Sequence, residues 1–273
     1  MKLELDTALI RSSLGHGIAV MRQSWRQFWP LMLIVSAINF TGSSIDSQLA
    51  RLICTILGGL LTISLFGALF RIADPSRDLA HPNLGRFGIQ FRDIEARLLW
   101  AYLGKAAILV FIGLLLVVFN LVLAAIIAYG RGHELTLANP SAYWVELGPL
   151  GLCVLAITII ISTLYIMWLS IRLYLVEPAS AYGREPQILS TLPLTRGSLY
   201  SLGLAIGVVW VGYLIALIAS GGIGYSVPSS LMKYALMCVL ESALIFVLVP
   251  FDIGIKAALY RSLKARHNPV EDP

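Results

Sequence analysis

The sequence predicts an all-α membrane protein with six transmembrane helices in three hairpins, amphipathic interfacial helices, and both termini in the cytoplasm. Three observations support this class. The 273 residues are 58% hydrophobic and only 13% charged, with a mean hydropathy of +0.82, whereas about a quarter of the residues in soluble domains are charged. Uncharged apolar runs of about 20 residues, the length that crosses a bilayer, recur along the chain. Basic residues lie at the ends of these runs rather than in one patch, so the net charge of +5 does not indicate nucleic-acid binding.

The N-terminal stretch, residues 1–28, is predicted to form an amphipathic helix. Ile18, Met21, Trp25 and Phe28 recur at intervals of three and four residues, which places them on one helical face. Such a helix either lies in the headgroup plane or packs against the protein's own cytoplasmic surface. The sequence leaves both options open.

Six apolar segments are predicted to span the membrane within a single domain, residues 1–273. The first is the shortest in its apolar part and is followed by a predicted turn at Thr41, so a re-entrant element is an alternative. Gly221 and Gly222 are predicted to end the fifth span, and residues 252–273 form a basic cytoplasmic tail. The predicted spans cover residues 28–45, 51–70, 106–129, 148–171, 199–220 and 234–251.

The distribution of Lys and Arg predicts the orientation. Seventeen of the 20 basic residues lie in the N-terminal stretch, residues 71–105, residues 172–196 and the tail, and three lie in the opposite loops, at Arg51, Arg131 and Lys233. Loops rich in basic residues stay in the cytoplasm. Both termini are therefore expected on the cytoplasmic side.

No metal or cofactor site is predicted. Cys54, Cys153 and Cys238 lie singly in apolar runs, and the four histidines show no ligand spacing. The sequence also lacks a glycine-rich phosphate loop, a nucleophile elbow and a catalytic pair of carboxylates. It therefore gives no support for enzyme chemistry.

Glu241 is the costliest residue of the predicted spans. It is the eighth residue of the last span, and a charge near the bilayer centre costs about 2.5–3.5 kcal/mol on insertion scales. Asn120 and Tyr213 lie at a similar depth in the third and fifth spans. The three residues are a candidate intramembrane polar site, either for a proton or substrate or as a structural hydrogen bond between helices.

Two further features concern the packing of the spans. Arg172 and Asp252 lie at the inner ends of the fourth and sixth spans and are a candidate ion pair. They form a gate or a lipid-headgroup contact, or they snorkel to the interface with some ion pairing. Gly203 and Gly207 form a small-xxx-small pair in the fifth span, which favours close packing within the protein over a dimer interface.

The segment between the fourth and fifth spans resembles a known family. The residues that carry the resemblance are Arg172-Leu173, Glu177, Pro178, Leu189-Ser190 and Leu194-Thr195-Arg196-Gly197. In this order they resemble the signature of a broad group of bacterial six-span inner-membrane proteins, which includes the membrane domain beside glycerophosphoryl diester phosphodiesterases and related membrane proteins of unassigned function. The resemblance implies a bacterial inner-membrane protein with an acid–proline elbow, and it supplies no catalytic residues.

Three functions follow as hypotheses. The first is a non-enzymatic inner-membrane protein that packs, senses or organises lipid or a membrane-protein partner. The alternative is a transporter or permease of a small or amphiphilic molecule, with Glu241 in its pathway. A membrane enzyme is the third. The sequence indicates neither a substrate nor an oligomeric state.

Overall fold

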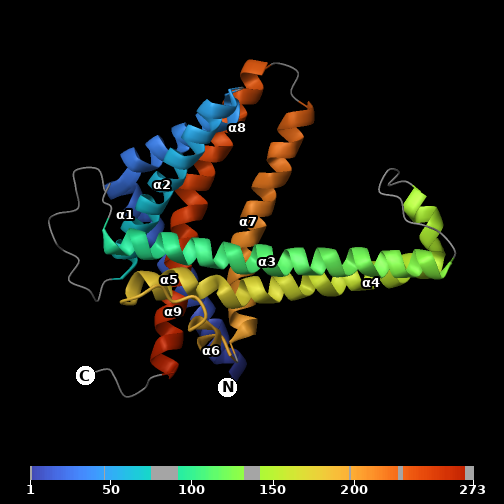
Figure 1. Cartoon of the computed structure of the whole chain (residues 1–273). Coiled ribbons are helices and arrows are strands. Elements are labelled where there is room, and N and C mark those ends of the chain that lie inside the picture. The colour runs from blue at the N-terminus through green and yellow to red at the C-terminus, as the bar shows by residue number, and fades with distance from the viewer. Residues whose placement is uncertain are drawn as a thin grey trace. The chain divides into compact units, whose positions relative to one another are not determined.

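The computed structural model describes residues 2–45, 47–74, 92–131, 142–196, 198–226 and 230–267. Helices account for 93% of these residues, which contain no strand. In chain order they are α1 (Lys2–Ser44), α2 (Gln48–Ala73), α3 (Asp93–Gly130), α4 (Ala142–Arg172), a 3₁₀ turn (Leu173–Leu175), α5 (Val176–Tyr182), α6 (Thr191–Leu194), α7 (Leu199–Ser226), α8 (Ser230–Ala243), a π-helical segment (Leu244–Leu248) and α9 (Val249–His267) (Figure 1).

Five helices in the described part of the chain are long and apolar enough to cross a membrane. The all-α membrane class is therefore confirmed at this level. The first predicted span lies in α1, which is not among the five, so its crossing of the membrane stays a prediction. The five helices cover Gln48–Ala73, Asp93–Gly130, Leu147–Tyr182, Leu199–Ile223 and Met232–His267.

The chain divides into two compact units. The first unit combines Met1–Tyr102 with Tyr174–Pro273, and the second is Leu103–Leu173. The described residues of the second unit are most of α3 and α4, two antiparallel helices joined by the Asn120 amide, which donates to the Ser162 hydroxyl at 3.1 Å. This unit corresponds to the predicted second hairpin.

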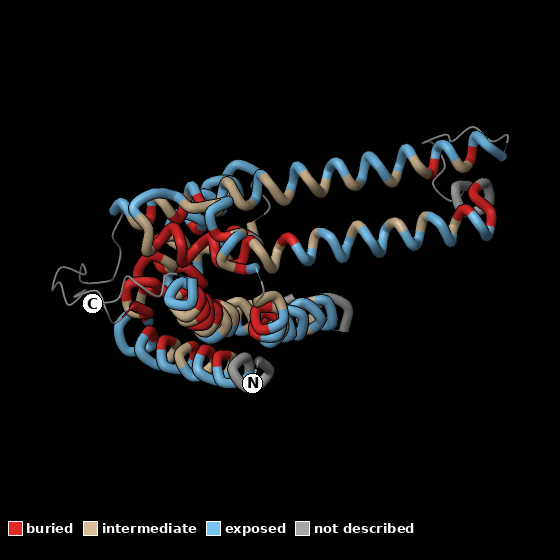
Figure 2. Tube along the Cα trace, turned by 90° about the horizontal axis from the view of Figure 1, so that it is seen from below, coloured by how far each residue is buried: buried red, intermediate tan, exposed pale blue. Residues whose placement is uncertain are grey.

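The second unit has little core of its own. Ala124, Ala128 and Leu147 form a small buried cluster near one end of the hairpin, and most of the rest is exposed or half-buried (Figure 2). α4 is kinked at Gly148, whose φ of 62° lies in the left-handed region that glycine adopts without strain. Pro149 follows directly, and the residue before a proline disfavours the α conformation.

Small residues bring α1 and α9 of the first unit together. A Cβ built on Gly254 would lie 2.7 Å from the Gly17 Cα, so the two backbones touch at this crossing. The buried face of α1 runs along Ser13, Gly17, Val20 and Ser24. Gly203 and Gly207, the pair predicted to pack closely, instead face open space.

The N-terminal part of α1 packs against the protein, one of its two predicted environments. The packed face is offset from the predicted apolar stripe, because the glycine and serine side allows the closer approach. Ile18 and Trp25 of the predicted stripe are 41% and 42% exposed, whereas Phe28 is buried. Ile18 and Trp25 are thereby left on the outer surface of α1.

One predicted turn and one predicted helix end are wrong. α1 continues to Ser44, and Thr41 donates its hydroxyl to the Ala37 carbonyl within the helix instead of forming a turn. α7 continues through Gly221 and Gly222 to Ser226. In both places the gain from continued backbone hydrogen bonding outweighs the turn-forming tendency of Thr41 and of the Gly221 and Gly222 pair.

The predicted cytoplasmic elbow and the first part of the predicted tail are buried helices. The elbow forms the 3₁₀ turn and α5, in which Glu177 is 1% exposed. The tail begins within the continuous helical stretch that ends in α9, where Asp252 and Lys256 are also buried. Residues 268–273 lie outside the described residues.

Candidate functional site

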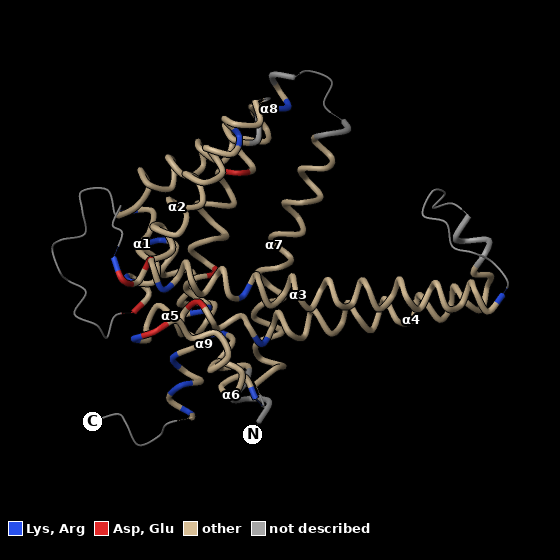
Figure 3. Tube along the Cα trace, in the orientation of Figure 1, with Lys and Arg blue, Asp and Glu red and all other residues tan. Residues whose placement is uncertain are grey.

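The charged residues of α9 form the centre of a buried site in the first unit. Asp252 and Lys256 lie one helical turn apart, and the Lys256 ammonium is 2.6 Å from Asp252 Oδ2. The same ammonium forms an ion pair with Glu177 of α5. All three side chains are almost entirely removed from solvent, and several charged positions of the first unit lie around α5 along the chain trace (Figure 3).

Two tyrosines extend this site. The Tyr174 hydroxyl donates to Asp252 Oδ1, and the Lys256 ammonium lies 4.9 Å from the centroid of the Tyr174 ring. The Tyr102 hydroxyl donates to the Glu177 carboxylate. Hydrogen bonds to ionised groups are stronger than neutral ones, and the aromatic face attracts the ammonium. We call Tyr102, Tyr174, Glu177, Asp252 and Lys256 the buried charge cluster.

A helical irregularity precedes the cluster on α9. Pro250 has no amide hydrogen, so it cannot donate to the carbonyl four residues earlier, that of Phe246. Trp25 of α1 donates its indole N–H to this carbonyl at 2.5 Å. The π-helical segment lies at the same place. Such segments are frequent at functional sites, and this one ends four residues before Asp252.

α5 is held in place by hydrogen bonds to two other helices. Pro178 lies in its first turn, where a missing amide hydrogen costs little. The Tyr182 hydroxyl donates to the Phe70 carbonyl of α2 at 3.1 Å, and Arg97 of α3 donates to the Gly183 carbonyl. The cluster therefore joins α3, α5 and α9 through side chains that their neighbours position.

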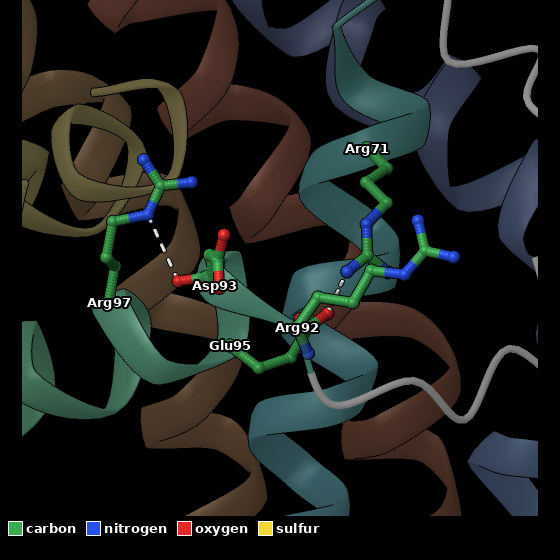
Figure 4. Close-up of polar contacts among 5 residues, drawn as sticks. All are labelled: Arg71, Arg92, Asp93, Glu95 and Arg97. Carbon is green, nitrogen blue, oxygen red and sulfur yellow. Dashed lines mark hydrogen bonds and ion pairs between the residues drawn. The ribbon is translucent and has the colours of Figure 1, made fainter. Parts of the chain in front are cut away.

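A second buried ion pair lies where α2 ends and α3 begins (Figure 4). Arg71 pairs with Glu95, whose other carboxylate oxygen accepts the Arg92 amide at 2.9 Å. Gly67 makes room for this carboxylate, because a Cβ there would lie 2.8 Å from Glu95 Cδ. This pair is electrically neutral.

The buried charge cluster contains two carboxylates and one ammonium, so it carries one net negative charge when all three are ionised. Removing ions from water costs several kcal/mol each, and ion pairing and hydrogen bonds offset that cost. Two chemical roles fit: a fixed junction between helices, or a site that holds a proton. The described residues contain no group of three or more His, Cys, Asp or Glu side chains able to hold a metal ion.

The predicted polar site around Glu241 is not assembled among the described residues of the first unit. Glu241 is half-buried in α8, and Tyr213 of α7 is 39% exposed without a hydrogen bond to it. Asn120 lies in the second unit, where it donates to Ser162 and to the Leu116 carbonyl. A functional role for Glu241 stays a prediction.

The predicted partners Arg172 and Asp252 have other contacts. The Arg172 guanidinium lies 4.6 Å from the centroid of the Trp168 ring, and Asp252 pairs with Lys256 and Tyr174. The predicted pair of Arg172 with Asp252 stays a prediction.

The family-like segment contributes one residue to the cluster. Glu177 belongs to it, and Pro178 allows the start of α5 beside it. Thr195 is buried and donates to the Leu192 carbonyl at 3.0 Å, whereas Arg196 is exposed. Gly197 lies outside the described residues.

Sequence reasoning missed the site roles of Lys256, Tyr174, Tyr102 and Glu95. A signal was present for Lys256, since an Asp and a Lys four residues apart form a pair on one helical face. The tyrosines gave no such signal, because tyrosine is common at the ends of membrane spans.

Searches against family models, curated proteins and solved structures found no match. The geometry of the chain is therefore the basis for its proposed function, and the family resemblance at residues 172–197 stays a prediction.

Proposed function

We propose that the chain is a non-enzymatic, multi-pass protein of the bacterial inner membrane, which associates with membrane lipids and organises them or a membrane-protein partner. One observation carries this proposal. In the most apolar 18-residue windows of α3 and α4, only 6% of the residues are buried. Apolar surface on that scale requires a lipid or protein environment.

The orientation belongs to the same proposal. Basic residues are in excess in the N-terminal stretch, in residues 71–105 and 172–196, and in the C-terminal stretch. This distribution supports six spans with both termini in the cytoplasm. In that arrangement the buried charge cluster lies near the cytoplasmic ends of the spans. We infer that it serves as a junction that holds these ends together while the exposed helix surfaces meet lipid.

Membrane extraction tests this function. The full chain, expressed in bacteria, should stay in the membrane pellet after an alkaline carbonate wash and should be released by detergent, with phospholipid retained on purification. Release by carbonate alone would contradict the proposal, because it is the behaviour of a peripheral protein.

The buried charge cluster favours transport as a second candidate function. Ionisable residues inside membrane segments often mark proton or substrate pathways, and here Tyr102, Glu177, Lys256 and Asp252 form a continuous series of polar contacts.

Proton flux distinguishes the two candidates. Proteoliposomes that contain a pH-sensitive dye are exposed to an imposed potassium potential. Our proposal predicts that the wild-type chain leaks protons no faster than protein-free vesicles. A flux that Glu177→Gln abolishes would support transport instead.

A further inference from the structure

A groove of about 560 Å³ lies between α1 and α2 in the first unit. Arg51, near the start of α2, lies at one end, and Phe66 and Tyr102 lie at the other. The rings of Phe66 and Tyr102 pack with their centroids 5.5 Å apart. Fifteen residues of α2 separate Arg51 from Phe66, so the groove extends for about 22 Å along the helix.

Small side chains create this groove. Gly42 and Gly59 line it, and a Cβ built on Gly59 would meet no atom within 4 Å. Gly42 allows α1 to approach Cys54 of α2, because a Cβ there would lie 3.0 Å from the Cys54 Cβ. The space at Gly59 is therefore a real gap beside two helices that meet closely elsewhere.

The polar residues that line the groove include Asn39, Arg51 and two threonines. Thr55 donates its hydroxyl to the Arg51 carbonyl at 2.8 Å, and Thr62 donates to the Gly58 carbonyl at 2.7 Å. Both threonines thus satisfy their hydroxyls within α2. The groove is therefore mainly apolar, with Asn39 of α1 in its lining and Arg51 at one end, where the guanidinium donates to the Ile45 carbonyl at 2.9 Å.

The length and charge of the groove fit one kind of occupant. The hydrocarbon core of a bilayer is about 30 Å thick, so each leaflet contributes about 15 Å. A groove of about 22 Å therefore accommodates one acyl chain of a leaflet together with the glycerol region. Arg51 is exposed at the N-terminal end of α2, and arginine binds phosphate well.

We propose that this groove binds a glycerophospholipid of the surrounding membrane, with one acyl chain along Gly59 and the phosphate at Arg51. The proposal rests on the proposed membrane location. It goes beyond general lipid contact, because it specifies one bound lipid at one site.

Native mass spectrometry of the full chain in detergent tests this inference, with phosphatidylglycerol and dioleoylglycerol as the probes. The wild-type chain should bind one phosphatidylglycerol more tightly than any other. Gly59→Leu fills the groove without a backbone clash and favours the helix, so it should weaken that binding at least tenfold. The matched control is Gly207→Leu in α7. A Cβ there also meets open space, but Gly207 does not line the groove. It should bind as the wild type does.

Arg51→Gln tests the position of the headgroup. This variant should lose most of the preference for phosphatidylglycerol over dioleoylglycerol. Wild-type binding by Gly59→Leu, or an unchanged headgroup preference in Arg51→Gln, would overturn the proposal. A dimer that Gly59→Leu dissociates would also overturn it, by identifying a second copy as the occupant. All variants should remain in the carbonate-washed membrane. A result that contradicts lipid binding in the groove is therefore distinguishable from one that contradicts the membrane location.

Discussion

At the residue scale, Lys256 balances two buried carboxylates. Its ammonium contacts both Glu177 and Asp252, and its exposed fraction is 6%. Removal of one partner from a buried ion pair leaves an uncompensated charge, which costs far more than the pair contributes. The stability of the first unit therefore depends on this side chain more than on Lys264, the other lysine of α9.

We predict that Lys256→Met lowers the free energy of unfolding by about 3–5 kcal/mol, measured by denaturation in detergent micelles. Lys264→Met is the matched control, because Lys264 is exposed on the same helix and its loss should change little. Adding Glu177→Gln to Lys256→Met should restore part of the stability. Equal stabilities of the two lysine variants would contradict a role for the cluster in holding the fold.

Gly67 provides a second test at this scale. A methyl group there would press against the Glu95 carboxylate that pairs with Arg71. We predict that Gly67→Ala lowers the melting temperature, although alanine is intrinsically better in a helix by about 1 kcal/mol. Gly59→Ala, eight residues earlier and facing open space, should be neutral or stabilising. A higher melting temperature for Gly67→Ala than for Gly59→Ala would rule out close packing at Glu95.

His16 gives the fold a pH dependence. Burial, assisted by the Arg261 guanidinium, lowers the pKa of His16 below its ordinary value. Arg261 Nη2 lies 2.9 Å from His16 Nε2, and the Ala73 carbonyl is 3.0 Å from the same nitrogen. The unfolded chain therefore takes up a proton at a higher pH than the folded chain does.

The direction of the pH effect follows from linkage. The stabilising contribution of neutral His16 is complete above about pH 6.5, the ordinary pKa of histidine, and is lost as the pH falls below it. We predict a lower melting temperature at pH 5.5 than at pH 7.5, and a smaller difference in His16→Gln. His267→Gln, at an exposed position, should keep the wild-type difference. If His16→Gln kept the wild-type difference in melting temperature between pH 5.5 and pH 7.5, the assignment of this pH dependence to His16 would be refuted.

At the element scale, the long apolar helices were predictable and their ends were not. Uncharged runs indicated α2, α4 and α7, since length and composition decide whether a helix is stable in lipid. The predicted stops at Thr41 and Gly221 failed because helices in membrane proteins continue through residues that end soluble helices. The acid–proline pair at Glu177 was read as a loop, yet proline suits the first turn of a helix.

The candidate site was only partly predictable, for a related reason. Asp252 and Glu177 were identified as positions of interest, but their common partner Lys256 was assigned to a basic cytoplasmic tail. The contact between α5 and α9 joins residues about 80 positions apart, and no local pattern specifies such a pair. The face of α1 that packs on α9 was also misjudged, since glycine and serine determine the approach there.

The junction between α1 and the π-helical segment gives a prediction for whole elements. Trp25→Phe removes the only indole N–H that reaches the Phe246 carbonyl in the described part of the chain. The loss should cost about 1 kcal/mol of unfolding free energy, measured by thermal denaturation in nanodiscs. Trp29→Phe is the control, because Trp29 is 54% exposed. A larger loss of unfolding free energy in Trp29→Phe than in Trp25→Phe would contradict a stabilising role for the Trp25 hydrogen bond.

At the scale of the whole molecule, the two units differ in what they bury and what they expose. The first unit buries its charges among α2, α3, α5 and α9, whereas the second exposes apolar side chains along both of its helices. Each unit is stable only if water is excluded from its apolar surface. A bilayer meets this common requirement, and the excess of basic residues is the basis for the proposed orientation of the chain in it.

Topology mapping with reporter fusions tests this central claim most directly. Fusions after His81, Glu185 and Pro273 should show cytoplasmic reporter activity, and fusions after His133 and Pro228 should show periplasmic activity. Alternation of this kind is what six spans and a cytoplasmic excess of basic residues predict. Cytoplasmic activity at all five positions, or reversed activity at two or more of them, would contradict the proposed multi-pass arrangement.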